Sequence, residues 1–318
     1  RGFTYCIPPY MIRAGVVTGV MSFAEMDAMM YKIEGEDLYL IGTSEHSMIG
    51  KFIDTILQEE QLPQTLTSYS PCFRKEKGAH GIEERGVYRI HQFEKQEMIV
   101  VCKPEESPVW FDKLWKNTVD MFRTLDIPVR TLECCSGDLA DLKVKSFDVE
   151  AWSPRQKKYF EVGSCSNLGD AQARRLKIRV NGKDGKKYFA HTLNNTVVAP
   201  PRMLIAFLEN NLNADGSVNV TIKGGTIHGK IYPSGEAMDQ SKILGPCSVT
   251  IDLTDATSAP TILGTAKAFF TSDSIKFKGG QGKLILGADT SIEAVSATGT
   301  VQVEQSSDWV ADKVYVTI

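Results

Sequence analysis

The chain has 318 residues, with 36 Lys and Arg against 39 Asp and Glu, and a formal net charge of −3. This length allows one large domain or two ordinary ones, and the charge excludes a basic field over the whole chain, so any RNA contact has to use local basic patches. No apolar run approaches the ~20 residues that span a bilayer, and no charged-then-apolar leader follows Arg1, so we expect neither a signal peptide nor a membrane partner.

The seven cysteines are odd in number and include no C-x-x-C pair. They therefore indicate neither a disulfide framework nor a cysteine zinc site. Unpaired thiols are typical of a reducing compartment, and the sequence predicts a cytoplasmic protein.

The first two thirds of the chain mix helical and strand periodicity. Helices are predicted for Ser22–Tyr31, His46–Glu59 and Val109–Leu125, the last with an amphipathic pattern and a proline near its start. Strands are predicted for Leu38–Ile41, Gly86–Phe93, Met98–Cys102, Phe147–Trp152, Tyr159–Val162 and Tyr188–Leu193. Because strands dominate without regular β-α-β order, we expect an α+β fold, with helices packed on an antiparallel sheet.

The composition changes after about residue 220, and no arginine follows Arg202. Short alternating runs, punctuated by Gly, Ser, Thr and Asp, occur at Val218–Ile222, Ser248–Leu253, Ser274–Lys278, Lys283–Leu286, Gly299–Val303 and Lys313–Ile318. Such runs predict an all-β C-terminal region. The turn signal at Asp215-Gly216 divides the chain into 1–216 and 217–318. The runs do not indicate a function or a partner for the second region.

A charged segment between residues 73 and 97 carries the clearest chemical signal. A loop containing Gly78 and Gly81 separates Phe73-Arg74-Lys75-Glu76 from a second run, and a regular strand there would place Val87, Arg89, His91, Phe93, Lys95 and Glu97 on one face. A face that mixes cations, a ring and carboxylates is costly to bury unless these groups are paired or bind a ligand. An arginine can bind a phosphate group, and a carboxylate can bind an ammonium group. The alternative is a charged surface hairpin.

Several segments in register resemble the seryl-tRNA synthetases, a class II aminoacyl-tRNA synthetase family. Gly2–Pro9 resembles the motif 1 strand, and Ser136-Gly137-Asp138 and Asp148-Val149-Glu150-Ala151-Trp152 match further family segments. Residues 73–97 resemble motif 2 of that class. The others are Thr43-Ser44-Glu45, which resembles the amino-acid-binding Thr-x-Glu; Glu161-Val162-Gly163-Ser164-Cys165-Ser166-Asn167, which resembles the family's serine- and cysteine-rich segment; and Asn194-Asn195-Thr196 with Arg202, which resembles motif 3. The resemblance covers about residues 2–220. It implies the class II antiparallel sheet flanked by helices.

The resemblance also implies an activity. The enzyme would use ATP and Mg²⁺ to activate serine as seryl-adenylate, pass the seryl group to the acceptor end of tRNA(Ser), and form a homodimer through the motif 1 region near Gly2–Pro9. The residues implied are Arg74, Glu76 and Arg202 for catalysis; Arg74, Lys75, Glu76, Ile90, Phe93, Glu161, Val162, Gly163, Ser164 and Arg202 for ATP; Thr43, Glu45, Arg74, Glu97, Asn194 and Thr196 for serine; and Glu161 and Ser164 for Mg²⁺.

Two alternatives stay open. The resemblance begins inside motif 1, without the family's helical tRNA-binding arm, which suggests a paralogue that activates an amino acid for another acceptor. The second alternative is a non-catalytic binding protein, in which a β-sandwich-like tail does the binding. The retained Arg74, Glu76, Glu161 and Arg202 favour an enzyme.

Overall fold

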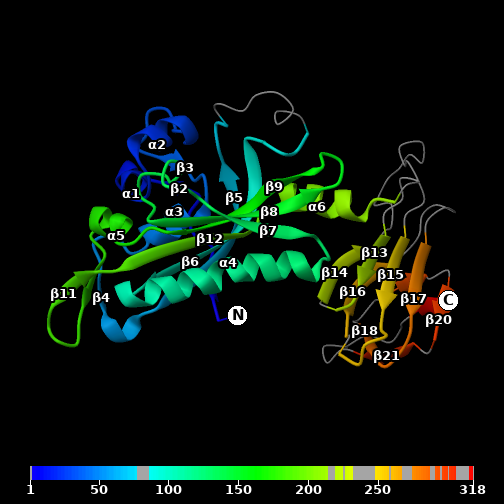
Figure 1. Ribbon diagram of the computed structural model, residues 1–318. Coiled ribbons are helices and arrows are strands. Elements are labelled where there is room, and N and C mark those ends of the chain that lie inside the picture. The colour runs from blue at the N-terminus through cyan, green and yellow to red at the C-terminus, as the bar shows by residue number, and fades with distance from the viewer. Residues whose placement is uncertain are drawn as a thin grey trace. The chain divides into compact units, whose positions relative to one another are not determined.

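The chain divides into two compact units, Arg1–Asn210 and Asn211–Ile318, which are described separately (Figure 1). The computed structural model describes residues 2–76, 86–213, 219–224, 226–231, 248–257, 259–266, 274–286, 291–293, 296–299, 301–305 and 315–317. The predicted boundary at Asp215-Gly216 lies outside these residues, so the division at 216 stays a prediction.

A seven-stranded sheet forms the centre of the first unit. Its strands, in spatial order, are β1 (Thr4–Tyr5), β5 (Gln64–Phe73), β6 (Gln92–Cys102), β12 (His191–Val198), β9 (Lys158–Asn167), β8 (Lys145–Ser153) and β7 (Val129–Glu133). Only β1 pairs in parallel, with β5, and every other neighbour in this sheet is antiparallel. The predicted antiparallel sheet with packed helices is confirmed.

Helices and short strands surround this sheet (Figure 1). The helices are α1 (Ala14–Val20), α2 (Phe23–Met29), α3 (Ser44–Gly50), α4 (Ser107–Thr124), α5 (Ala171–Leu176) and α6 (Pro200–Asn211), with 3₁₀ turns at Glu59–Gln61 and Pro104–Glu106. The short strands are β2 (Met11–Ile12), which pairs with β3 (Tyr39–Leu40), and β4 (Ile56–Gln58), which pairs with β10 (Arg179–Asn181) next to β11 (Lys187–Phe189).

Alternate side chains along β6 lie on opposite faces of the sheet. Met98, Val100 and Cys102 pack with Phe111 and Leu114 of α4. Ile99 and Val101 instead join a second cluster, together with α3 and α5 residues. Since side chains alternate along a strand, Phe93, Lys95 and Glu97 point to the same face as Ile99 and Val101. The polar site is therefore built on the α3 face of the sheet.

Three predicted elements of the first unit are wrong in part. The single strand expected over Tyr188–Leu193 is two strands, β11 and β12, which belong to different sheets. The helix expected over His46–Glu59 ends at Gly50, and Ile56–Gln58 forms β4, because the chain turns to pair with β10. The strand expected over Gly86–Phe93 begins only at Gln92. Gly86 has a φ of 71°, in the left-handed region, and its segment forms a turn instead.

The second unit is built of parallel strands. They are β13 (Asn219–Ile222), β14 (Thr226–Ile231), β15 (Ser248–Asp252), β16 (Thr261–Ala266), β17 (Ser274–Lys278), β18 (Lys283–Leu286), β19 (Ser291–Glu293), β20 (Ser296–Thr298), β21 (Gln302–Gln305) and β22 (Tyr315–Thr317). From β13 to β18 successive strands alternate between two sheets, and each pairs in parallel with a strand of the next coil, so the chain coils as a solenoid. The all-β region is observed, but every pairing described here is parallel. The β-sandwich-like architecture expected for the tail in the second alternative is therefore wrong, because a sandwich has antiparallel sheets.

Stacked apolar side chains fill this solenoid. Ile222 pairs in register with Ile251 and Ile251 with Phe277, whereas the next partner, Ala297, is exposed. Their neighbours in the core include Val249, Ile275, Leu284 and Leu286. In-register stacking lets each coil bury the same positions of the next, as in other repeat architectures.

Candidate active site

A cavity of about 330 Å³ opens on the α3 face of the seven-stranded sheet. Residues from widely separated segments line it, including the turn before β6, the strands β6, β9 and β12, and the segment leading into α6. The predicted site residues on this wall are Thr43, Glu45, Arg74, Glu76, Ile90, Phe93, Glu97, Glu161, Val162, Gly163, Ser164, Asn194, Thr196 and Arg202. Sequence segments up to about 160 residues apart thus meet at one cavity.

Lys75 is the predicted site residue that does not line this cavity. Its Nζ donates a hydrogen bond to the Asp27 carbonyl (3.1 Å), and its backbone N donates to the Met29 carbonyl (2.9 Å). Lys75 is therefore directed toward α2. The motif 2 loop at residues 77–85 lies outside the described residues.

One wall of the cavity is the start of α3. Thr43 is the N-cap, and its hydroxyl accepts from the Glu45 backbone N (3.4 Å). The Glu45 carboxylate accepts from Gln172 Nε2 (2.8 Å). Burial, followed by the negative charge of Glu97, raises the pKa of the Glu45 carboxyl. Two acidic groups that oppose each other in this way favour a bound cation such as an ammonium group.

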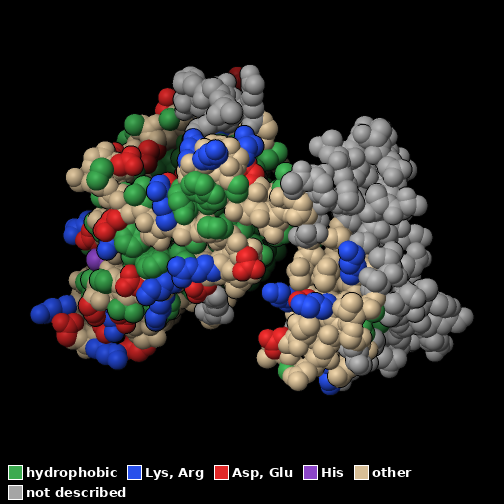
Figure 2. Space-filling view, turned by 45° about the vertical axis from the view of Figure 1, so that its right-hand side comes forward, with side chains coloured by type: hydrophobic (Ala, Val, Ile, Leu, Met, Phe, Trp, Pro, Cys, Tyr) green, Lys and Arg blue, Asp and Glu red, His purple; other side chains and the backbone are tan. Residues whose placement is uncertain are grey.

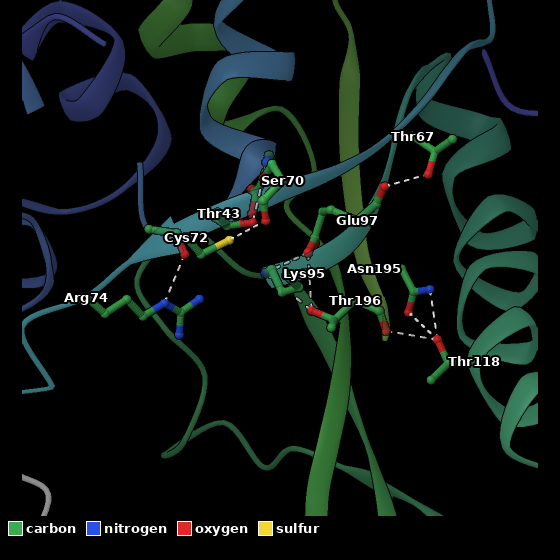
Figure 3. A network of polar contacts seen from close by, with 12 residues as sticks. Thr43, Thr67, Ser70, Cys72, Arg74, Lys95, Glu97, Thr118, Asn195 and Thr196 are labelled. Atoms are coloured by element: carbon green, nitrogen blue, oxygen red, sulfur yellow. Dashed lines mark hydrogen bonds and ion pairs between the residues drawn. The ribbon is translucent and has the colours of Figure 1, made fainter. Parts of the chain in front are cut away.

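Lys95, Glu97 and Thr196 form a buried polar group in the centre of the sheet (Figure 3). Lys95 Nζ lies 2.6 Å from Glu97 Oε2 and donates to Thr196 Oγ1 (3.4 Å). The Thr196 hydroxyl in turn donates to Glu97 Oε2 (3.3 Å). The pairing in register of Thr196 with Glu97 across β12 and β6 brings these groups together.

The other face of β12 supports this arrangement. Asn195 Nδ2 donates to Thr118 Oγ1 (3.0 Å), and Thr118 of α4 donates to the Thr196 carbonyl (3.0 Å; Figure 3). Asn195 and Thr118 are fully buried. A buried, satisfied network of this kind holds Asn194 and Thr196 on the cavity face.

Arg74 directs its guanidinium along the cavity wall. Its Nε donates to the Gly42 carbonyl (3.0 Å), and its Cζ lies 5.5 Å from the centre of the Phe93 ring. The stacking and the single backbone contact orient the planar fork. Its remaining donors suit an anion with oxygen acceptors.

A bulge in β9 places two oxygen donors on the cavity wall. In a regular strand, Glu161 and Ser164 would face opposite sides. The register with β8 shifts between Val149–Gly163 and Glu150–Glu161, and both Glu161 and Ser164 line the cavity. Bulges commonly re-aim side chains in this manner.

Arg202 closes the same wall from α6. Its Nη1 donates to Glu161 Oε2 (2.9 Å), and its guanidinium lies 4.7 Å from the centre of the Tyr88 ring. Tyr88 itself packs edge-on against Phe160. In the described residues, Arg202 therefore reaches the cavity already paired with a carboxylate.

Several lining residues were missed by the sequence analysis. Tyr88, Lys143 and His46 are examples. Tyr88 lies in the charged segment that already stood out, so its neighbours could have indicated it. His46 follows Glu45 directly, and burial, with the Arg74 and Lys95 charges, lowers its pKa to about 3. Nothing in the sequence around Lys143 indicates a cavity position.

The surface of the first unit carries both charge signs. On the face turned toward the viewer in Figure 2, Lys and Arg side chains border apolar patches and alternate with Asp and Glu, without one continuous basic area. Within the described ranges, no helix is long and apolar enough to cross a membrane. In the same part of the chain, no group of three His, Cys, Asp or Glu residues could hold a metal by itself.

Comparison with known proteins gives concordant matches. Residues 30–211 match the tRNA synthetase class II core domain (G, H, P, S and T). The chain is 45% identical over 221 residues to the serine–tRNA ligase of Pyrococcus furiosus and 47% identical over 221 residues to that of Thermococcus sibiricus, which covers 69% of this chain and 49% of each relative. The chain therefore spans about half the length of these curated relatives.

Solved structures give a similar result. The crystal structure of seryl-tRNA synthetase from Pyrococcus horikoshii complexed with ATP superposes with a TM-score of 0.67 at 46% identity, over 69% of this chain and 49% of that one. The cytoplasmic serine–tRNA ligase of Naegleria fowleri in complex with AMP gives 0.64 at 36% identity, over 69% and 52% of the two chains.

Proposed function

The chain belongs to the tRNA synthetase class II core family, and from this premise we propose that its first unit activates serine with ATP to form seryl-adenylate. The observation that carries the proposal is the single cavity that collects Arg74, Phe93, Glu97, Glu161 and Thr196. A nucleotide and a small hydroxylated amino acid need the cations, ring, carboxylates and hydroxyls that this cavity offers. Relatives whose names include serine–tRNA ligase support the choice of substrate.

Serine binding would use the α3 and β6 walls. Glu45 and Glu97 hold the ammonium group, and Thr43, Asn194 and Thr196 offer hydrogen-bonding partners for the amino acid. A site that bonds a substrate hydroxyl rejects alanine, because its own buried polar groups would then be left unpaired. The Lys95–Glu97–Thr196 group keeps those partners in fixed positions.

The chemical step would rely on position and charge. A serine carboxylate oxygen forms a bond to the α-phosphorus, the bond from that phosphorus to the bridging oxygen breaks, and pyrophosphate leaves with the electron pair. Arg74 binds the α-phosphate and the serine carboxylate, Phe93 stacks on adenine and Ile90 contacts it through the backbone. Glu76, Val162, Gly163 and Arg202 complete the nucleotide site. No protein nucleophile is required.

Mg²⁺ fits the donors on β9. Magnesium is usually held by one or two carboxylates together with substrate phosphates, and Glu161 and Ser164 both present oxygen to the cavity. When bound, the ion would neutralise phosphate charge. The Glu161–Arg202 pair (2.9 Å) keeps this carboxylate on the cavity wall in the free protein.

The whole-protein activity would be that of a serine–tRNA ligase, with the acceptor end of tRNA(Ser) receiving the seryl group in the cytoplasm. A homodimer through the motif 1 region is part of the same proposal. It is supported by the edge position of β1 and by the exposed apolar side chains of Tyr5, Ile7, Tyr10 and Met11. Sedimentation at several protein concentrations tests the dimer; a constant monomer mass contradicts it.

Serine-dependent exchange between ATP and labelled pyrophosphate tests the proposed activation. We expect exchange with serine, and little with alanine or threonine. A folded sample that binds no ATP and gives no exchange would disprove the proposal. Charging of tRNA, compared with other acceptors, separates a ligase from a paralogue that serves another acceptor.

A further inference from the structure

The loop between β7 and β8 contributes a wall of the cavity that the proposed function does not use. Ala140, Leu142 and Lys143 line the cavity from this loop. The Lys143 backbone N donates to the Ala140 carbonyl (2.9 Å), and Leu142 is buried. The Val144 backbone N donates to the Asn167 carbonyl at the end of β9 (2.9 Å), which attaches the loop to the sheet and holds the half-buried Lys143 at the cavity.

Some of the cationic side chains that line the cavity are paired with carboxylates and others are not. Five of them line it: Arg74, Arg89, Lys95, Lys143 and Arg202. Carboxylates pair with three, as Arg89–Glu76 (3.0 Å), Lys95–Glu97 (2.6 Å) and Arg202–Glu161 (2.9 Å). Throughout the described ranges, no ion pair includes Arg74 or Lys143. An anionic ligand meets the least competition at these two side chains.

Lys143 lines the cavity together with Glu161 and Ser164 of β9. Asp148 of β8 pairs in register with Ser164 of β9, and burial, followed by the Glu161 charge, raises the pKa of the Asp148 carboxyl. The positive charge of Lys143 acts in the opposite direction on Asp148. A lysine that lines the same cavity as a carboxylate suited to a divalent cation is an arrangement that fits a polyphosphate, whose several negative charges need more than one partner.

We infer that Lys143 contacts the β- or γ-phosphate of the bound nucleotide and neutralises charge on pyrophosphate as it leaves. This inference rests on the proposed function. Arg74 is assigned to the α-phosphate, so Lys143 supplies the second uncommitted cation, at the outgoing end of the chain of phosphates. Its compact charge on a flexible stem suits a leaving group that moves during the reaction.

Binding of ATP, AMP and inorganic pyrophosphate to the whole chain tests this assignment, with Mg²⁺ present and titration calorimetry as the readout. For Lys143→Gln we expect an affinity loss of about tenfold or more for ATP and pyrophosphate, the size of one charge-assisted hydrogen bond. AMP lacks the outer phosphates and should bind within about twofold of wild type, and Lys143→Arg should restore ATP binding.

Lys145→Gln is the matched control, because Lys145 is exposed, pairs with Glu133 (3.6 Å) and lies outside the cavity lining. It should leave all three affinities unchanged. An equal loss for AMP and ATP with Lys143→Gln, or no loss for either, overturns the inference while wild-type ATP binding still supports the proposed function. Absence of ATP binding by the folded wild-type chain instead removes the proposed function itself.

Discussion

Lys95 Nζ lies 2.6 Å from Glu97 Oε2, and the two side chains are only 8% and 2% exposed. The charges are two residues apart on β6, so they point to the same face and reach each other without distorting the strand. Two charges taken out of water cost free energy that their attraction offsets only when further hydrogen bonds satisfy them. Thr196 supplies those bonds to both partners.

Removing one partner of this pair should destabilise the first unit. For Lys95→Met we expect a loss of about 3 kcal/mol, because Glu97 is left as an uncompensated buried charge. Lys95→Met/Glu97→Leu should lose less than the sum of the single changes. Urea unfolding measures both, and strict additivity would show that the two side chains do not interact.

Arg74 should be needed for activation and not for folding. Arg74→Lys keeps the charge but loses the planar fork that stacks on Phe93 and donates to the Gly42 carbonyl. We expect ATP–pyrophosphate exchange to fall by about 100-fold or more, with an unchanged unfolding midpoint. Arg174→Lys, at an exposed pair with Asp170, is the control and should keep full exchange.

The sequence predicts the site residues that lie in short motifs, but not the features that depend on side-chain direction or on a bulge. Thr43, Arg74, Glu161 and Arg202 lie in short motifs whose residue types identify them, and their cavity follows from sheet pairing. Lys75 shares such a motif and yet is directed toward α2, because residue type does not determine the direction of a side chain after a strand ends. Glu161 and Ser164 share a wall only because of a bulge, which no sequence periodicity indicates.

The fold shows a similar limit. Alternation predicted six of the ten described tail strands at least in part and missed β14, β16, β19 and β20. An apolar face repeats every second residue in parallel and antiparallel sheets alike. Alternation could not distinguish a sandwich from a solenoid, because that depends on pairing between distant strands. The helix predicted over His46–Glu59 was cut short for the same reason: Ile56–Gln58 pairs with Arg179–Asn181, far along the chain.

Gly163 should tolerate no side chain. A Cβ there would lie 2.8 Å from the Thr196 carbonyl oxygen, which belongs to the backbone of β12 and cannot move aside cheaply. Gly163→Ala should cost about 1–3 kcal/mol of stability and weaken serine binding, because β9 and β12 have to separate beside the site. Gly137→Ala is the control, since nothing lies within 4 Å of its Cβ. Equal stability of the two variants would contradict this reading.

Lowering the pH should destabilise the first unit, because the unfolded chain protonates His46 more readily than the folded state does. Its pKa is lowered from 6.5 to about 3 by burial and by the Arg74 and Lys95 charges. Above pH 6.5 neither state is protonated; below it the unfolded chain takes up the proton first, so stability is lost by about 1.4 kcal/mol per pH unit until the folded state also titrates.

His46→Gln removes this effect and is the measurement to make. Between pH 6 and about 4, the wild type should lose more unfolding free energy than the variant. Glu45, whose pKa is raised, contributes with the opposite sign, as its stabilisation is lost when pH rises through the folded pKa. It is present in both proteins, so to a first approximation it cancels in the difference. Parallel pH profiles would show that His46 is not the titrating group.

Truncating Phe277 should destabilise the solenoid without changing ATP binding by the first unit. Phe277 is among the largest fully buried side chains, pairs in register with Ile251 and belongs to the same apolar core. Phe277→Ala leaves a cavity in the middle of the stack and should cost about 3–5 kcal/mol. Since each coil contacts only its neighbours, losing one contact separates the coils on either side, and the whole tail should unfold at a lower urea concentration.

The tail's core contains only tail residues, so ATP affinity should not change. Lys276→Ala, an exposed position on the same strand, should leave both properties unaltered; a drop in ATP affinity with Phe277→Ala alone would show that the two units are energetically coupled.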